Sequence, residues 1–275
     1  MKLTFLGTGT SQGVPVIACR CGVCTSADER DRRLRTAALL STDEGRNILF
    51  DIGPDFRQQM LRHKVDHLDA ILITHAHRDH VAGLDDIRSF NYVQHRKMDI
   101  YLNAEAAHAI QRDYHYIFEP HQYPGLPEAN LHVVDGVFSV QCPVTSDATQ
   151  SGGSPLATGH WPLATGLEVT PIRAMHKDLP ILGFRIGEMA YITDANYIAP
   201  EEMVKLKGLK VLVLNALRKE KHFSHYCLPE ALEVIALLKP EQAYLTHISH
   251  EMGHHADVQL PEGVALAYDG LEITF

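Results

Sequence analysis

The sequence predicts an α/β fold, because short apolar segments typical of strands alternate with segments of helical periodicity along its 275 residues. Side chains with metal-binding chemistry directly follow several of these apolar segments. Apolar content is ordinary for a globular chain, and no repeat or linker marks a boundary. We therefore expect a single domain over residues 1–275.

The N-terminal part is expected to begin with a strand at 2–6, followed by a glycine loop. The loop misses the dinucleotide-binding fingerprint by one position and leads to Pro15 and cysteines instead of a helix, so we interpret it as a tight turn. Two strands at 37–41 and 47–51 flank a hairpin turn, and a helix is expected at 56–64.

A buried strand at 69–73 precedes helices expected to begin near 83 and to span 104–116. Residues 143–166 are rich in Ser, Thr, Gly, Ala and Pro, which predicts a loop insertion, either disordered or a lid that faces substrate. Regular periodicity then resumes, with strands expected at 167–171, 183–186, 189–193, 210–214 and 242–246 and a helix at 229–238.

The most informative motif is H-x-H-x-D-H, formed by His75, His77, Asp79 and His80 directly after the strand at 69–73. His75 and His77 are two residues apart and project to the same side of an extended chain. Asp79 and His80 follow where the chain must turn. The motif therefore predicts ligands that converge on one or two cations, a pattern that 18 scattered histidines rarely produce by chance.

Three further polar residues end apolar segments in the same manner, namely His176, Asp194 and His247. Each alone is typical of a turn or a capping residue. Together with the H-x-H-x-D-H motif they predict one site, which we expect at a single sheet edge.

The five cysteines are Cys19, Cys21, Cys24, Cys142 and Cys227. An odd number, with three in C-x-C-x-x-C, argues against a disulfide framework and for zinc-bound thiolates in a reducing compartment. Zinc prefers four ligands, so the triplet needs one more from elsewhere in the chain. We interpret Cys142 and Cys227 as isolated buried thiols.

The formal charge of −9 provides no positive field over the whole molecule, which disfavours nucleic acid as a partner. No run approaches the roughly 18 apolar residues of a spanning helix, and the apolar N-terminal run is too short for a signal peptide. We expect a cytoplasmic protein that is not bound to a membrane and acts on a small molecule.

On these residues the chain resembles the metallo-β-lactamase superfamily. The resemblance implies an αββα sandwich of two mixed β-sheets flanked by helices, with two divalent cations at its active site. It also implies that Asp51 orients a ligand histidine from outside the ligand set. The implied ligands are His75, His77 and His176 for one metal, Asp79, His80 and His247 for the other, and Asp194 as the bridge.

A narrower resemblance covers nearly the whole chain. Residues 5–9, the C-x-C-x-x-C run, residues 245–250 and residues 268–273 are similar to the PhnP-like cyclic phosphodiesterases. This resemblance implies that His250 completes a structural zinc site with Cys19, Cys21 and Cys24, and that the protein forms a homodimer. The segment 143–166 has no counterpart in the pattern.

The same resemblance gives His225 a catalytic role, because phosphodiesterases of the superfamily carry a histidine near the leaving group 22 residues before the last ligand, here His247. We interpret His225 as the proton donor, with Asp79 as the second catalytic residue. His222 is the competing candidate for the proton donor, and the choice stays open.

The predicted function is hydrolysis of small cyclic or nucleotide-like phosphodiesters by a hydroxide that bridges two manganese or zinc ions. A carbon-ester or lactone hydrolase is one alternative. A metal oxidoreductase similar to PqqB is another, although PqqB departs from the histidine motif that is intact here. A transfer-RNA 3′-processing nuclease shares the histidine spacing, but the charge and the lack of an obvious basic arm weigh against it.

Overall fold

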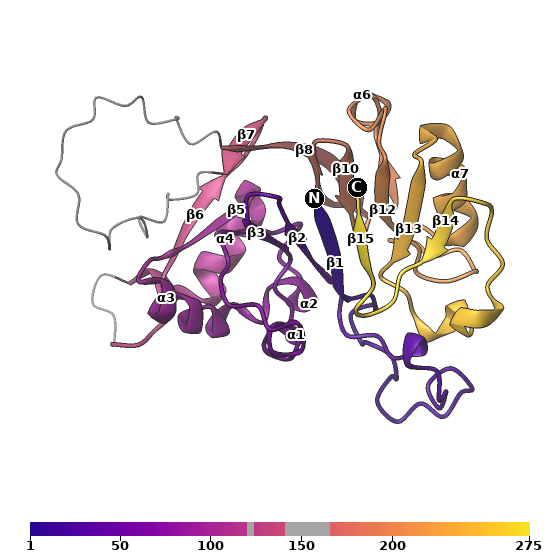
Figure 1. The fold of residues 1–275 in the computed structure, drawn as a ribbon, viewed down its shortest axis with the longest axis horizontal. Helices are drawn as coiled ribbons and strands as arrows, with labels where there is room; N and C mark the ends of the chain where they lie inside the picture. The colour runs from indigo at the N-terminus through magenta and orange to yellow at the C-terminus, as the bar shows by residue number, and fades with distance from the viewer. Residues whose placement is uncertain (120–123, 141–165) are drawn as a thin grey trace, which may run out of the picture.

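The computed structural model describes residues 1–119, 124–140 and 166–275, and its strands form two mixed sheets (Figure 1). The first sheet has the order β15-β1-β2-β3-β4-β5-β6. Its strands are β1 (Lys2–Gly7), β2 (Ala37–Ser41), β3 (Asn47–Phe50), β4 (Ala70–Leu72), β5 (Met98–Leu102), β6 (Ala129–Val133) and β15 (Glu272–Thr274). Because β1 pairs with β15, the two ends of the chain lie side by side, and the Met1 amino group donates to the Phe275 carbonyl over 3.1 Å (Figure 1).

The second sheet has the order β11-β8-β9-β10-β12-β13-β14, with β7 paired to β8. Its strands are β7 (Phe138–Val140), β8 (Leu167–His176), β9 (Leu179–Ile186), β10 (Met189–Ile192), β11 (Tyr197–Ile198), β12 (Val211–Asn215), β13 (Gln242–Thr246) and β14 (Val264–Leu266). Strands β10, β12, β13 and β14 run parallel, so their carboxyl ends lie at the same end of the sheet.

The helices lie on the outer faces of the two sheets, which makes the αββα sandwich that the family resemblance implies (Figure 1). The α-helices are α1 (Phe56–His63), α2 (Arg78–Val81), α3 (Arg88–Gln94), α4 (Ala104–Asp113), α5 (His115–Phe118), α6 (Pro200–Val204) and α7 (Leu228–Leu238). Short 3-10 helices are η1 (Glu29–Asp31), η2 (Leu84–Ile87), η3 (His250–Met252) and η4 (His255–Asp257).

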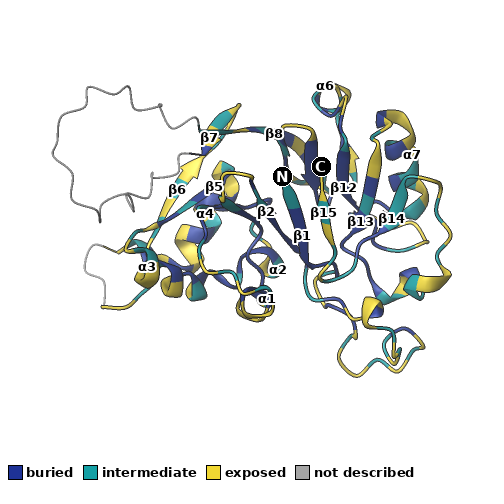
Figure 2. Cartoon of the chain, in the orientation of Figure 1, coloured by how far each residue is buried: buried dark blue, intermediate teal, exposed yellow. Residues whose placement is uncertain are grey.

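Three buried apolar clusters separate these four layers, and the alternation of side chains along each strand explains them. In β3, Ile48 and Phe50 pack between the two sheets, whereas Leu49 faces the helices that cover the first sheet. In β12, Val213 faces the other sheet and Leu214 faces the helical side. Strands buried on both faces are apolar at every position, and Figure 2 shows these central strands as buried.

Most strands expected from the sequence occur within one or two residues of their predicted ends. The exceptions are β9, which begins four residues before the expected start at 183, and β8, which continues five residues past Pro171. The proline is tolerated because neither β11 nor β7 pairs with β8 at that residue, so no hydrogen bond is lost on the open side. The helix expected at 104–116 is instead two helices, α4 and α5, that meet at Tyr114.

The expected loop insertion at 143–166 and Cys142 lie, apart from Gly166, outside the described residues. Cys227 is buried at the start of α7, as expected of an isolated thiol. In the three described ranges of the chain, none of the helices has the length and apolar character needed to cross a bilayer.

Candidate metal centre

Five of the predicted site residues lie at strand ends and gather at one end of the sandwich. Asp51 follows β3 and His75 lies three residues after β4, both in the first sheet. His176 ends β8, Asp194 lies two residues after β10 and His247 directly follows β13, all in the second sheet. The prediction of a single sheet edge is therefore wrong, because the two packed sheets both contribute to the site.

His75, His77 and His176 form the first group, with one ligand atom from each within 4.8 Å of the others. The His75 Nε2 and His77 Nδ1 atoms are 3.0 Å apart. His176 Nδ1 lies 2.8 Å from the backbone carbonyls of Asp194 and Ser224, to which it can only donate. This contact fixes the tautomer of His176 and leaves its Nε2 lone pair free to bind a metal.

Asp79, His80, Asp194 and His247 form the second group, again with ligand atoms within 4.8 Å of one another. Asp194 Oδ2 lies 3.1 Å from both His80 Nε2 and His247 Nδ1. Both nitrogens are buried, yet neither has a hydrogen-bond partner of adequate geometry. Buried nitrogens that face carboxylate oxygens without bonding to them fit a set of metal ligands.

The electrostatics of Asp79, Asp194 and His247 favour the ionisation states that metals require. Burial lowers the pKa of His247 to about 4, which keeps the imidazole neutral near pH 7. Burial opposes ionisation of Asp194, but His247 and His80 outweigh it and hold the pKa of Asp194 well below its usual range. Burial likewise opposes ionisation of Asp79, but His80 lowers the pKa of Asp79. Both carboxylates are therefore charged and available.

Asp51 supports His80 from behind. The Asp51 Oδ2 atom lies 2.7 Å from His80 Nδ1, and Asp51 also accepts hydrogen bonds from the Thr74 backbone N–H at 2.8 Å and from its hydroxyl at 3.0 Å. Both Asp51 and His80 are fully buried. Burial opposes protonation of His80, but Asp51, Asp194 and Asp79 outweigh it and hold the pKa of His80 well above its usual value. A metal would therefore have to displace the Nε2 proton, while Nδ1–H stays bonded to Asp51.

Three of the site residues adopt left-handed backbone conformations, which side chains other than glycine rarely do. The φ angles are 60° at Asp51, 61° at Asp194 and 54° at His247. Each turns the chain sharply where a strand ends, so that the side chain points toward the cluster. Such conformations cost about 1–3 kcal/mol each and tend to occur at functional sites.

His225 lies at the edge of the cluster, in the loop before α7. Its Nε2 atom is 2.9 Å from Asp194 Oδ1, and its Nδ1 atom is 3.2 Å from His222 Nδ1. His225 therefore contacts the Asp194 carboxylate, and His222 reaches the cluster through His225. His225, His176 and Asp194 also satisfy the distances of a metal-binding group.

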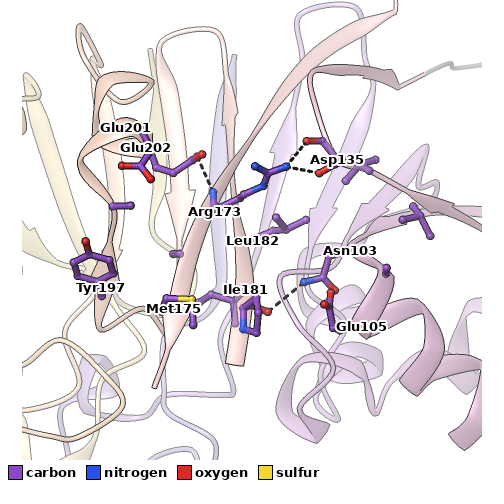
Figure 3. A pocket seen from close by; sticks show the side chains of 16 residues that line it. Asn103, Glu105, Asp135, Arg173, Met175, Ile181, Leu182, Tyr197, Glu201 and Glu202 are labelled. Atoms are coloured by element: carbon purple, nitrogen blue, oxygen red, sulfur yellow. Dashed lines mark hydrogen bonds and ion pairs between the residues drawn. The ribbon is translucent and has the colours of Figure 1, made fainter. Parts of the chain in front are cut away.

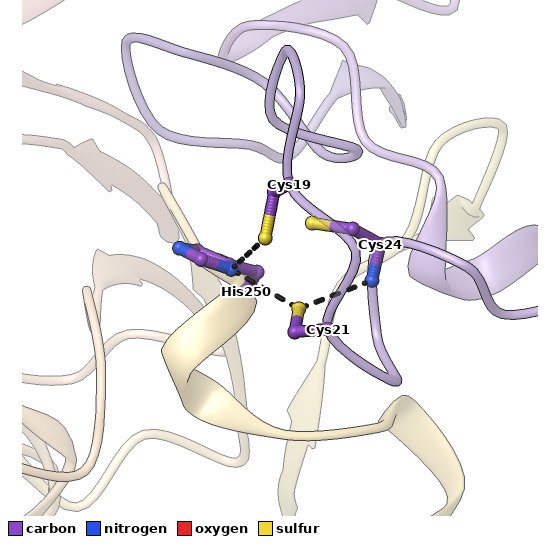
Figure 4. A group of neighbouring side chains, drawn as sticks. All are labelled: Cys19, Cys21, Cys24 and His250. Carbon is purple, nitrogen blue, oxygen red and sulfur yellow. Dashed lines mark hydrogen bonds between the residues drawn. The ribbon is translucent and has the colours of Figure 1, made fainter.

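Cys19, Cys21, Cys24 and His250 form a separate group (Figure 4). His250 Nδ1 lies 3.5 Å from Cys19 Sγ and 3.3 Å from Cys21 Sγ. Tetrahedral zinc with bonds of about 2.0–2.3 Å requires ligand atoms roughly 3.5–3.8 Å apart, so the group fits zinc after small adjustments. The hydrogen bond from His250 lowers the pKa of Cys21 to about 6, whereas burial raises that of Cys24 to about 11.

The two groups are joined by one short segment, because His247 and His250 are three residues apart. Between them, Ile248 donates its N–H to the Thr8 carbonyl over 2.8 Å, and its carbonyl accepts from Thr10 N at 3.2 Å. The glycine loop is thus a tight turn that holds this segment. A Cβ atom at Gly9 would lie 2.8 Å from a backbone oxygen, which explains the glycine there.

A cavity of about 230 Å³ opens beside the first group and is lined by His75, His77 and Arg112, among others. It shares Asn103, Glu105 and Pro180 with a larger cavity of about 710 Å³ between the edges of the two sheets (Figure 3). Arg173 crosses the larger cavity to pair with Asp135 (Figure 3). The sequence does not signal these lining residues, because they belong to ordinary strands and helix starts.

Residues 46–248 match the family described as Beta-lactamase superfamily domain, and the chain belongs to this superfamily. It has the metallo-β-lactamase fold, with two mixed β-sheets flanked by helices. Within the superfamily it lies close to the PhnP-like enzymes. A diphosphatase from the PhnP family, known from its crystal structure, has 34% sequence identity to this chain and superposes on it with a TM-score of 0.84. The match covers 100% of this chain and 97% of that one.

Other relatives share the fold or part of the sequence. Zinc-bound PqqB from Methylobacterium extorquens has a TM-score of 0.71 at 17% identity, covering all of both chains, which shows the fold alone. A curated octanoyltransferase from Porphyromonas gingivalis is 40% identical over 275 residues, which are 99% of this chain and 51% of that protein. The chain thus spans about half the length of that relative. It matches 34% of Coenzyme PQQ synthesis protein B from Methylobacterium nodulans, at 37% identity over 101 residues that are 32% of this chain.

Proposed function

We propose that this protein hydrolyses small phosphodiesters, cyclic or nucleotide-like, with two divalent cations. The observation that carries the proposal is the arrangement of two adjacent groups of ligand atoms, one of three histidines and one of two histidines with two carboxylates. Asp194 belongs to the second group and also lies within ligand distance of His176 in the first. The similarity to a diphosphatase over the whole chain supports chemistry at phosphorus.

The proposed ligands keep the division expected from the sequence, and manganese or zinc suits this mixture of imidazole and carboxylate. When bound, such a pair of cations supplies a hydroxide nucleophile near pH 7 and neutralises the phosphoryl oxygens during in-line displacement. One cation is assigned to His75, His77 and His176, the other to Asp79, His80 and His247, with Asp194 shared.

In this proposal His225 donates the proton that the departing oxygen needs. Its Nε2 atom lies 2.9 Å from Asp194 Oδ1, which places the imidazole at the edge of the cluster, where a departing oxygen can reach it. Asp79 acts as a ligand and orients the nucleophile. Asp51 keeps His80 in the tautomer that binds metal.

We also propose that Cys19, Cys21, Cys24 and His250 hold one structural zinc within a single domain over residues 1–275. The free thiolates suit a reducing compartment such as the cytoplasm. The proposed homodimer rests on the PhnP-like resemblance and is tested by the molar mass in solution.

The reaction class is tested with three substrates at equal concentrations: bis(p-nitrophenyl) phosphate, a lactone and an octanoyl thioester, the last because one relative is an octanoyltransferase. We expect the phosphodiester to have the highest kcat/KM, with activity lost in a chelator and restored by manganese or zinc. A higher kcat/KM for the lactone or the thioester would contradict the proposal and favour the carbon-ester alternative.

The role of His225 is tested by His225→Ala and, as its matched control, His222→Ala. Loss of a general acid typically lowers kcat by about 10²- to 10⁴-fold. We expect that loss in His225→Ala with unchanged metal content, and a much smaller one in His222→Ala. Loss of one metal equivalent in His225→Ala would instead make His225 a ligand.

A further inference from the structure

An exposed aromatic ring lies at the rim of the candidate site. Phe223 is 70% exposed. It directly precedes Ser224, which is buried, and lies two residues before His225 in the same loop. Its ring centroid is 4.5 Å from that of His222, which in turn is 5.1 Å from the ring of His225. Two ring contacts therefore lead from Phe223 to the histidine that touches Asp194.

Asn196 fixes the position of this rim by joining three segments. Its Nδ2 donates to the Phe223 carbonyl at 3.3 Å, its Oδ1 accepts from the Lys177 N–H at 2.8 Å, and its own N–H donates to the Met175 carbonyl at 2.8 Å. Each of the three segments also carries a residue at or beside the metal cluster. His176 directly precedes Lys177, Asp194 lies two residues before Asn196, and His225 lies two residues after Phe223.

Lys177 adds a positive charge beside the ring. It follows His176 in a left-handed conformation with φ 56°, and its Nζ lies 5.8 Å from the centre of the Phe223 ring. The ammonium also lies 3.6 Å from the exposed carboxylate of Asp178, a pair that water screens and that a ligand anion can replace. The rim thus presents a flat apolar face and an ammonium group together.

We propose that Phe223 and Lys177 bind the planar aromatic part and a neighbouring anionic oxygen of the substrate, so that the site prefers phosphodiesters that carry a nucleobase. This inference rests on the proposed function and narrows its substrate class. Bases stack on any exposed aromatic face, whereas a Lys ammonium is a common partner of phosphate oxygens. Phe223 combines a cation over its ring with a framework that it shares with the cluster.

The test compares two substrates that share the reacting group, a nucleoside 2′,3′-cyclic phosphate and glycerol cyclic phosphate. Stacking contributes enough that Phe223→Ala should raise KM for the nucleoside substrate by about 5- to 100-fold, with kcat little changed. KM for the glycerol substrate should stay the same. Phe223→Tyr, which keeps the ring, should resemble the wild type, and Lys177→Ala should raise KM for both substrates.

Leu237→Ala is the matched control, because Leu237 is 71% exposed on α7 and has no part in the site. An equal effect of Phe223→Ala on both substrates, or no effect on either, would overturn the inference. If the wild type hydrolyses neither substrate, the proposed function fails first. In that case, calorimetry in a chelator compares the binding of adenosine 3′-monophosphate to the wild type and to Phe223→Ala. Equal affinities would overturn the proposal that Phe223 stacks on the base, and weaker binding by the variant would support it.

Discussion

Removal of the Asp51 carboxylate is the sharpest test of how the protein prepares its ligands. In Asp51→Ala the Thr74 N–H and the His80 Nδ1–H lose their acceptor in a site with no exposed surface. Breaking a buried pair of this kind costs about 3–5 kcal/mol. Loss of a carboxylate behind a ligand histidine also weakens metal binding by about 10- to 100-fold. We therefore expect Asp51→Ala to have a lower free energy of unfolding and a lower metal affinity than the wild type.

Asp51→Asn separates the two effects. The amide oxygen can still accept from Thr74, so the free energy of unfolding should fall less than in Asp51→Ala. The amide nitrogen would face His80 Nδ1, however, and would favour the tautomer that places the proton on Nε2, where the metal must bind. We therefore expect Asp51→Asn to lose as much metal affinity as Asp51→Ala.

The assays are urea unfolding of metal-free protein and competition with a chelator for the bound metal. Asp69→Ala is the control, since Asp69 accepts from Asn47 N at 2.7 Å at the opposite ends of β3 and β4. It should lower stability and leave metal affinity unchanged. Wild-type metal affinity in Asp51→Asn would refute the reasoning about the His80 tautomer.

Three further predictions follow from the geometry. Gly53→Ala should destabilise the protein by about 1–3 kcal/mol and weaken metal binding, because the added Cβ would lie 2.1 Å from the Asp79 carbonyl oxygen. The control is Gly136→Ala, whose Cβ would meet no atom within 4 Å and which should leave the thermal unfolding temperature unchanged. In metal-stripped protein, alkylation of Cys21 should rise as the pH increases through about 6, the value to which His250 lowers its pKa, and zinc should block it; a midpoint near 9 would contradict this. Asp194→Asn should reduce the metal content of the catalytic cluster, and a variant that keeps both ions would argue against a shared ligand.

The sequence is sufficient to predict several of the side chains that gather at the candidate site, because they share one local pattern: a polar residue where an apolar strand ends. His75, His176 and His247 all follow this pattern, and the structure brings their groups together. It also predicts the central strands, since apolar residues at successive positions of β12 and β13 indicate burial on both faces.

The other features of the fold and of the site depend on tertiary contacts that leave no local signal in the sequence. The sequence could not show that both sheets contribute to the site, because a polar residue at the end of a strand does not reveal which sheet that strand joins. Strands such as β11 and β15 have two or three residues and form only against a neighbour already in place. Phe223 and Lys177 are ordinary residues in the sequence, and tertiary contacts such as the bonds of Asn196 place them together.

The central claim is that the cluster at the end of the sandwich binds two neighbouring cations. Anomalous diffraction at the zinc edge, from crystals grown with zinc, tests it most directly. We expect two adjacent peaks among His75, His77, His176, Asp79, His80, Asp194 and His247, and a third peak among Cys19, Cys21, Cys24 and His250. A single peak in the cluster, or none, with the cysteine site filled, would contradict the dinuclear account.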